Sequence, residues 1–297
     1  MNPFRRIGVI GKRRQPNTQL LQDVCTAIAD LGCEVLLESN PALKNARSVE
    51  QVSRDVIGQT CELVVVVGGD GTLLDVGRAL APTGVPILGV NQGRLGFMVD
   101  IPPATMQETL AVIINGEYEI EDRLLLSARM RRNGGDPGPE RLAVNDVVIR
   151  NQATIRMIEF ETWLGEEFIS NHRADGVIVS SPTGSTAYAL SGGGPLLHPS
   201  LSAMAIIPIC PHTLSDRPVV VGGDKLIKIV VHGADRTQAM VTFDGQTSEL
   251  LKSGDTVEVR SAGCSLRMIH PAGHSYFRIL RDKLRWGSDQ LPTQERV

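Results

Sequence analysis

The stretch that decides the fold is Glu-Leu-Val-Val-Val-Val-Gly-Gly-Asp-Gly-Thr-Leu-Leu, at residues 62–74. Its four consecutive valines are typical of a strand buried on both faces, as in a parallel sheet covered by helices. Glycines at 68, 69 and 71 then turn the chain, and an apolar pattern with helical spacing begins at Leu73. Strand, turn and helix in this order predict a ligand-binding crevice at the carboxyl end of the strand.

The first hundred residues alternate short apolar runs with amphipathic stretches, which is the pattern of βαβ units. One predicted helix has apolar residues from Leu20 to Leu31, with Thr18 as its cap and Gly32 as its stop, and another covers Met106–Ile114. Four predicted strands surround them: Arg6–Gly11, Cys33–Glu38, Glu62–Val67 and Pro86–Val90.

After Asn115-Gly116 strict alternation replaces the helical period, which predicts a mainly antiparallel, sandwich-like domain. The last apolar pattern, Ser275–Trp286, is helical and is expected to pack back onto the first domain. We therefore predict a Rossmann-like α/β domain over 1–117, joined by 275–297, and a β-rich domain over 118–274 with a cleft between the two. The predicted strands of the second domain are Leu142–Arg150, Thr154–Trp163, Lys225–Val231, Ala239–Phe243 and Thr256–Val259.

Composition narrows the class of protein. A chain of 297 residues with 42% hydrophobic and 21% charged residues suits a two-domain soluble protein, and its mean hydropathy of -0.01 predicts no membrane span. The net charge of -3 argues against a nucleic-acid partner. Five scattered cysteines without a C-x-x-C pair, and no signal-like apolar run, favour a reducing cytoplasm, and no His/Cys cluster has zinc spacing. We expect no protein metal site.

The run Gly68-Gly69-Asp70-Gly71-Thr72 suits a phosphate-binding turn. Glycine lets the backbone approach a phosphate, and the following helix N-terminus favours anions. A carboxylate at this position would repel phosphate oxygens, so its presence indicates a function. General-base catalysis is such a function, and it is the role expected for Asp70. The alternative is a tight turn capped by Asp70 or Thr72. The run is neither a P-loop nor a dinucleotide fingerprint, since G-K-[ST] and G-x-G-x-x-G are both missing.

The run Gly68–Thr72 resembles the signature of the NAD kinases, which diacylglycerol-type lipid kinases and 6-phosphofructokinases share in a looser form. Two further segments resemble the NAD kinases alone: Asn145-Asp146 within 142–149, and residues 175–188, Asp-Gly-Val-Ile-Val-Ser-Ser-Pro-Thr-Gly-Ser-Thr-Ala-Tyr. Residues 91–97 and the Asp244-Gly245-Gln246 turn continue the resemblance in order along the chain.

The resemblance implies an enzyme that transfers the γ-phosphate of ATP to the 2′-hydroxyl of the adenosine ribose of NAD. Asp70 would accept the hydroxyl proton, while Gly71 and its neighbours shape the site. A positioned base contributes on the order of 10²–10⁴ in rate. We expect Mg²⁺ or another divalent cation to arrive bound to ATP rather than in a protein site.

Residue types fit the implied NAD contacts. Asn145 offers a donor and an acceptor to an adenine edge, Asp146 can accept from ribose hydroxyls, and a polar bulge in a strand is their alternative explanation. Tyr188 has an aromatic face for a base, and Arg173 suits pyrophosphate. The resemblance also assigns NAD contacts to Asp175, Thr186, Ala187 and Ser191.

Three implied contacts have equally simple structural explanations. Phe97 either walls the adenine pocket or belongs to the core, and Arg156 either reaches a phosphate or lies on a solvated strand face. Gln246 matches a family ligand position, although by itself it indicates a hairpin turn. His172 and His212 receive no role.

The sequence thus predicts an NAD kinase whose partners are NAD and ATP, without nucleic acid or membrane, and a homo-oligomer (dimer or tetramer) as is usual in the family. One rival is a lipid or sugar kinase, which predicts an apolar or sugar-phosphate site in place of Asn145-Asp146. The other rival is a non-catalytic NAD(H) sensor, against which the presence of Asp70 counts.

Overall fold

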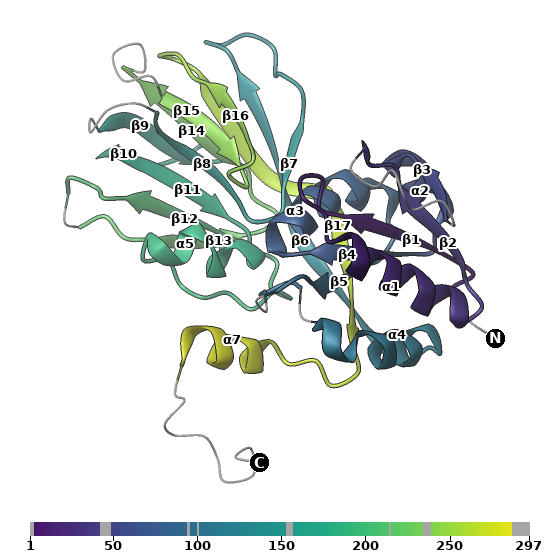
Figure 1. Ribbon diagram of the computed structural model, residues 1–297. Coiled ribbons are helices and arrows are strands. Elements are labelled where there is room, and N and C mark those ends of the chain that lie inside the picture. Colours follow the sequence, from purple (N-terminus) through teal and green to yellow (C-terminus); the bar gives the residue numbers. More distant parts are fainter. Residues whose placement is uncertain are drawn as a thin grey trace. The chain divides into compact units, whose positions relative to one another are not determined.

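The computed structural model describes residues 3–41, 49–93, 96–99, 101–152, 157–213, 215–233 and 239–286. The chain forms two compact units (Figure 1). The first unit comprises Met1–Val76, Thr83–Glu121 and Arg267–Val297, and the second comprises Gly77–Pro82 and Asp122–Leu266.

The first unit is built on a parallel sheet with the strand order β3-β2-β1-β4-β5 (Figure 1). The valine-rich strand β4 lies between β1 and β5, and all six of its residues are buried. This is the environment that the valine run predicts. The strands are β1 Arg6–Gly11, β2 Glu34–Glu38, β3 Glu50–Val52, β4 Leu63–Gly68 and β5 Ile87–Asn91.

Helices cover both faces of this sheet. Alternate strand residues such as Val9 and Val65 share one core with the buried faces of α1 and α4. On the opposite face α2 packs against Gly8, where an added Cβ would lie 2.4 Å from Ile57, and α3 contacts Gly89 through Leu73. The helices are α1 Thr18–Asp30, α2 Arg54–Thr60, α3 Asp70–Leu80 and α4 Met106–Ile114, with short 3-10 turns at Ala81–Thr83 and Pro103–Thr105.

The second unit is a sandwich of two mainly antiparallel sheets. One has the order β13-β12-β11-β8-β15-β16, and the other contains β10-β9-β14 and the first part of β17, with β6 and β7 alongside. The strands are β6 Tyr118–Arg131, β7 Arg141–Ala143, β8 Asp146–Asn151, β9 Ile158–Leu164, β10 Glu167–Ala174, β11 Gly176–Ser180, β12 Ala203–Ile209, β13 Val219–Gly222, β14 Ile227–His232, β15 Ala239–Phe243, β16 Thr247–Leu250 and β17 Thr256–Pro271.

The main core of this unit lies between its two sheets. Val147 and Val177 from one sheet and Phe160 and Ile229 from the other belong to the same buried cluster. The opposite face of the first sheet carries Ile178 and Ile207, which pack with Ala189 of the short helix α5, Tyr188–Ser191. The predicted fold class, with an α/β unit and a sandwich-like β-rich unit, is confirmed.

Several predicted boundaries were wrong. The cap of α1 is Asn17, whose side chain accepts from the Leu20 N–H, and Thr18 is already helical. The predicted strand Leu142–Arg150 is interrupted at 144–145, where the chain leaves β7 and enters β8. The last strand continues past Val259 to Pro271. The first residues of the predicted strand Thr154–Trp163 lie outside the described residues.

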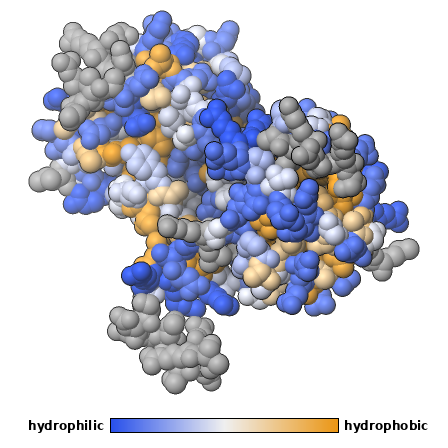
Figure 2. All heavy atoms as spheres, in the orientation of Figure 1, coloured by the Kyte–Doolittle hydropathy of each residue, from blue (hydrophilic) through white to orange (hydrophobic). Residues whose placement is uncertain are grey.

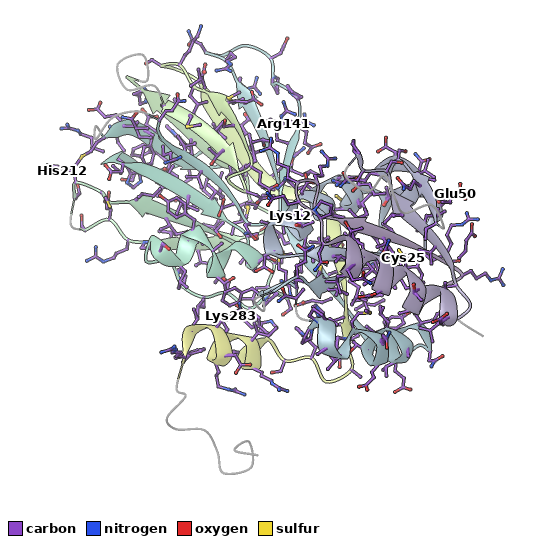
Figure 3. All side chains as sticks on the ribbon, viewed as in Figure 1. Lys12, Cys25, Glu50, Arg141, His212 and Lys283 are labelled. Atoms are coloured by element: carbon purple, nitrogen blue, oxygen red, sulfur yellow. The ribbon has the colours of Figure 1, made fainter. Side chains whose placement is uncertain are left out.

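The C-terminal helix α7, Tyr276–Leu284, belongs to the first unit. Strand β17 leads to it, and Met268 of β17 pairs in parallel with Ile87 of β5. Lys283 lies on α7 (Figure 3). Its ammonium stands 5.9 Å from the centre of the Phe97 ring. The expected return of the last helix to the first unit is therefore confirmed.

The visible surface is mainly hydrophilic, with hydrophobic residues in small separate patches (Figure 2). Across the described ranges, none of the helices combines the length and the apolar character that crossing a bilayer requires.

Candidate functional site

The glycine turn joins β4 directly to α3 in the first unit. β4 ends at Gly68, and Asp70 is the first residue of α3. A Cβ on Gly68 would lie 2.5 Å from the Thr72 hydroxyl, so this position requires glycine, whereas Gly69 faces open space. The Thr72 N–H donates to the Gly69 carbonyl at 2.9 Å. The exposed backbone of Gly69 and Gly71 therefore lies at the helix N-terminus.

The carboxylate of Asp70 is held by the backbone of a second loop. One oxygen accepts from the Phe97 N–H at 2.9 Å, and the other accepts from Met98 and Val99 at 3.1 Å each. A Cβ on Gly96 would lie 2.0 Å from this carboxylate, so only glycine allows the approach. Three donors fix the orientation of a half-buried anion, and this contact with residues 96–99 was not predicted from the sequence.

Four of the predicted NAD-binding residues line one pocket of about 520 Å³ in the second unit: Asn145, Asp146, Ala187 and Tyr188. The other wall combines the Asp244-Gly245 turn, which the resemblance includes, with three strand residues that were not predicted from the sequence. The remaining lining residues are Val148, Arg150, Thr242, Asp244 and Gly245.

Two backbone segments bring these residues together. Ser180 and Asp146 are partners in the β8–β11 pair, and the Ser181 N–H donates to the Asn145 carbonyl at 2.9 Å. The next turn packs so closely that a Cβ on Gly184 would lie 2.1 Å from the Asn145 carbonyl oxygen. Glycine is therefore needed at position 184 so that this turn can pack against Asn145.

Asp244 holds the break between β7 and β8. Its buried carboxylate accepts from the backbone N–H groups of Val144 at 3.0 Å, Asn145 at 2.7 Å and Asp146 at 3.1 Å. Arg78 of α3, within the same unit, donates to it at 2.5 Å. These four donors make the Asn145-Asp146 bend a defined structure and not a loose bulge.

Two side chains of this pocket, Asn145 and Asp146, have unusual hydrogen bonding or an unusual pKa. The Asn145 Oδ1 atom is buried, and no hydrogen-bond partner for it is found in the described part of the chain. Burial, together with the neighbouring Asp244 carboxylate, raises the pKa of the Asp146 carboxyl from 3.8 to about 7. An unsatisfied acceptor beside a carboxyl that changes charge near neutral pH is typical of a ligand site.

Five other predicted NAD-binding residues of the second unit are not among the residues that line this pocket. Gln246 accepts a hydrogen bond from Arg78, which sequence reasoning did not single out. Arg173 lies on β10, where its Nε is 3.4 Å from Glu159, and the exposed Asp175 follows that strand. Thr186 ends a 3-10 turn over Thr183–Thr186 and Ser191 ends α5. Arg156 lies outside the described residues.

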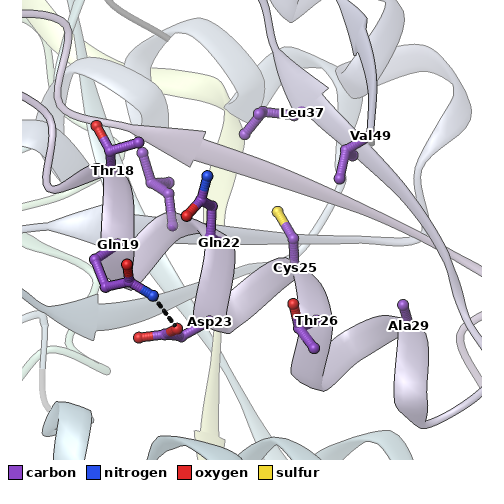
Figure 4. A pocket seen from close by; sticks show the side chains of 10 residues that line it. Thr18, Gln19, Gln22, Asp23, Cys25, Thr26, Ala29, Leu37 and Val49 are labelled. Atoms are coloured by element: carbon purple, nitrogen blue, oxygen red, sulfur yellow. Dashed lines mark hydrogen bonds between the residues drawn. The ribbon is translucent and has the colours of Figure 1, made fainter. Parts of the chain in front are cut away.

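Another pocket, of about 450 Å³, lies along α1 in the first unit (Figure 4). Gln19 and Asp23 on its rim are joined by a 2.8 Å hydrogen bond, and Cys25 and Leu37 line it. None of the predicted site residues lines this pocket, so it is not the candidate site.

Two protein-family models match this chain. The model of the ATP-NAD kinase N-terminal domain matches residues 7–118, and that of the C-terminal domain matches residues 144–271. The NAD kinase of Hahella chejuensis is 43% identical over 292 residues, 98% of each chain. A Pseudomonas aeruginosa NAD kinase is 44% identical over 97% of this chain and 98% of its own length.

Two solved structures share the fold. An NAD kinase from Archaeoglobus fulgidus in complex with ATP has a TM-score of 0.75 and 26% identity, covering 94% of this chain and 98% of that one. Yeast NADH kinase complexed with NADH has a TM-score of 0.87 over 97% of this chain and 89% of that one, and at 22% identity it supports the fold alone. Since both domain models match and the relatives are similar over almost the whole chain, this protein belongs to the NAD kinase family.

Proposed function

We propose that this chain transfers the γ-phosphate of ATP to the 2′-hydroxyl of the adenosine ribose of NAD, giving NADP and ADP. Besides family membership, the observation that carries the proposal is the shared pocket of Asn145, Asp146, Ala187 and Tyr188. Its polar groups and aromatic wall match an adenosine and do not match an apolar lipid.

Each pocket group has a role in holding the adenosine. The buried Asn145 Oδ1 accepts from the adenine amino group, which satisfies an atom otherwise left unpaired in the described structure. Asp146 binds ribose hydroxyls, and the exposed ring of Tyr188 stacks on a base. Further NAD contacts are proposed for Phe97, Arg156, Arg173, Asp175, Thr186, Ser191 and Gln246.

Asp70 is the proposed general base. As the ribose oxygen bonds to the γ-phosphorus, the bond from that phosphorus to the bridging oxygen breaks and ADP leaves. The hydroxyl proton passes to the Asp70 carboxylate, whose direction is set by the N–H groups of residues 97–99. The N–H groups at the start of α3, with Gly68, Gly69, Gly71 and Thr72, hold phosphate oxygens.

Mg²⁺ is proposed to enter with ATP. The carboxylate nearest the glycine turn, Asp70, already accepts three N–H donors, which does not suit an additional role as a metal ligand. Mg²⁺ commonly keeps several waters and binds through substrate phosphates. We therefore assign it no protein cage at this turn.

The proposal also includes a cytoplasmic location and a homo-oligomeric state. All five cysteines are free thiols, as expected for a reducing cytoplasm. We also propose a homo-oligomer, a dimer or tetramer, formed through the β-rich unit. Exposed apolar side chains support this choice: Phe168 and Ile169 on β10, and Val219 and Val220 on β13.

Replacement of the proposed base tests the chemistry. Asp70→Asn keeps the size of the side chain but removes the proton acceptor, so kcat should fall at least about 100-fold while NAD affinity changes little. Formation of NADP from NAD, ATP and Mg²⁺ is measured with a coupled dehydrogenase that accepts only NADP, and NAD affinity is measured by calorimetry.

Asp255→Asn is the matched control, because it too removes a carboxylate that accepts backbone N–H groups, here from Asn133 and Lys252. It should keep kcat. An unchanged kcat in Asp70→Asn would exclude the general-base role. If the wild type binds NAD but forms no NADP in a single-turnover experiment, the chain is a sensor and not a kinase.

A further inference from the structure

Three potential metal ligands meet in the first unit, away from the glycine turn: Glu121 of β6, His270 of β17 and His274 of the turn that follows β17. One ligand atom from each lies within 4.8 Å of the other two. This is the one such group of three or more His, Cys, Asp or Glu ligands in the ranges that the structure describes. His270 and His274 have the H-x3-H spacing of many zinc ligands, but Glu121 is far from them in sequence, so the chain alone does not reveal the third ligand.

The geometry is near to that of a bound ion. Glu121 Oε2 and His270 Nε2 are 3.3 Å apart. Two ligands about 2.0–2.1 Å from a tetrahedral Zn²⁺ are separated by about 3.3 Å. The pair therefore already has the spacing of one edge of a zinc tetrahedron.

The third ligand needs one side-chain movement. The rings of His270 and His274 are stacked, with centroids 3.7 Å apart and an interplanar angle of 21°. In-plane lone pairs of nearly parallel rings do not converge on one point, so one ring must turn to share an ion. His274 is only partly buried and lies in a turn, whereas His270 is 2% exposed within a strand. His274 is therefore the ring that moves.

Burial and access also suit an ion. Fixed His270 supplies a preorganised ligand, and the partly exposed Glu121 and His274 give a path from solvent. Two imidazoles and one carboxylate leave room for a water molecule and match a borderline transition metal better than Mg²⁺, which prefers oxygen ligands. We propose that Glu121, His270 and His274 bind a divalent transition-metal ion, with Zn²⁺ as the best match.

Such an ion would anchor the C-terminal helix. It would join β6 and β17 to the turn before α7, where the Gly273 N–H already donates to Glu119 at 3.1 Å and Ser275 caps the helix. On α7, Lys283 stands over the ring of Phe97. The ion would thus have a structural role in the first unit, and its binding does not depend on the proposed kinase reaction.

The test is a zinc titration of the full-length protein. Protein stripped with a chelator is titrated with Zn²⁺ in competition with a metal indicator, and one ion per chain is expected. Glu121→Gln and His274→Asn should each weaken binding at least about 10-fold. Zinc should also slow amide exchange over residues 271–284 in the wild type and leave it unchanged in these variants.

Controls separate this group from other ligands on the surface. His198→Asn and Cys210→Ser remove an exposed imidazole and an exposed thiol elsewhere, and both should leave the affinity unchanged. Melting temperatures measured without metal identify variants that fail to fold, and in that case Glu121→Gln decides because it keeps the shape of the side chain. Failure of the wild type to bind Zn²⁺, or equal affinity in Glu121→Gln and the wild type, would overturn the proposal.

Discussion

Two carboxylate side chains each accept several backbone hydrogen bonds and so fix the course of the chain at a bend. Asp70 and Asp244 each accept three backbone N–H groups, and in both cases the donors come from residues distant in sequence. The sequence suggests that a carboxylate in a glycine turn has a function, but it contains no local signal for such long-range donors. The general-base role of Asp70 therefore stays a prediction, and its orientation by residues 97–99 could not be predicted.

Loss of the Asp244 charge should be costly. Asp244→Asn leaves the guanidinium of Arg78, whose side chain is 13% exposed, without its buried anion. Breaking a buried pair at one partner costs about 3–5 kcal/mol of unfolding free energy, which denaturant unfolding measures. Asp255→Asn is the comparison, because its partner Arg132 is 50% exposed and returns to water. Equal losses in the two variants would contradict the argument.

Asp146 should make stability depend on pH. Its pKa rises from 3.8 to about 7 in the folded protein, so between these values the folded state keeps a proton that the unfolded state has lost. Unfolding free energy should fall by about 1.4 kcal/mol per pH unit through this window and level off above pH 7. Asp146→Asn should remove this slope, while the exposed Asp136→Asn should retain it. Denaturant unfolding at several pH values measures both.

Strands and helices followed their local patterns where one face or both faces are buried. β1, α4 and β15 have the predicted bounds, because the apolar period and the turn residues agree there. The break in Leu142–Arg150 was not predicted, because the polar pair Asn145-Asp146 by itself suggested only a bulge within one strand. In the structure the backbone of Val144 donates to Asp244 and accepts from Ser181, and the strand ends there. Tertiary hydrogen bonds thus override the pattern at the part of the site that needs a bend.

Gly184 lies where the turn Thr183–Thr186 packs against Asn145, so its replacement tests whether this turn shapes the pocket. In Gly184→Ala the new Cβ would meet the Asn145 carbonyl oxygen at 2.1 Å, so the turn must move away from β8. We expect a loss of several kcal/mol in stability, in the range of severe overpacking, and NAD affinity at least about 10-fold weaker. Calorimetry and thermal unfolding measure the two effects.

Gly263→Ala is the matched control, because its Cβ would meet nothing within 4 Å. It should bind NAD as the wild type does. Wild-type NAD affinity in Gly184→Ala would show that the turn does not shape the binding pocket.

In the molecule as a whole, one helix and two strands run from one unit into the other. The division between the units falls within α3 at Val76 and Gly77, within β6 at Glu121 and Asp122, and within β17 at Leu266 and Arg267. The length of the chain and its change of period predict two domains, but they do not predict that elements continue from one unit into the other. Neither β6 nor the last part of β17 gave a separate signal in the sequence.

Shared elements predict cooperative unfolding. If one unit opens, the part of α3, β6 and β17 that belongs to it loses its regular structure, and the hydrogen-bond pattern of each remaining part is cut short. Amide hydrogens of β4 in the first unit and β11 in the second should therefore exchange with the same free energy of opening, and a saturating amount of NAD should raise both values equally. Native-state hydrogen exchange measures this, and a lower value confined to β4 or to β11 would show that the units unfold independently in spite of their common strands.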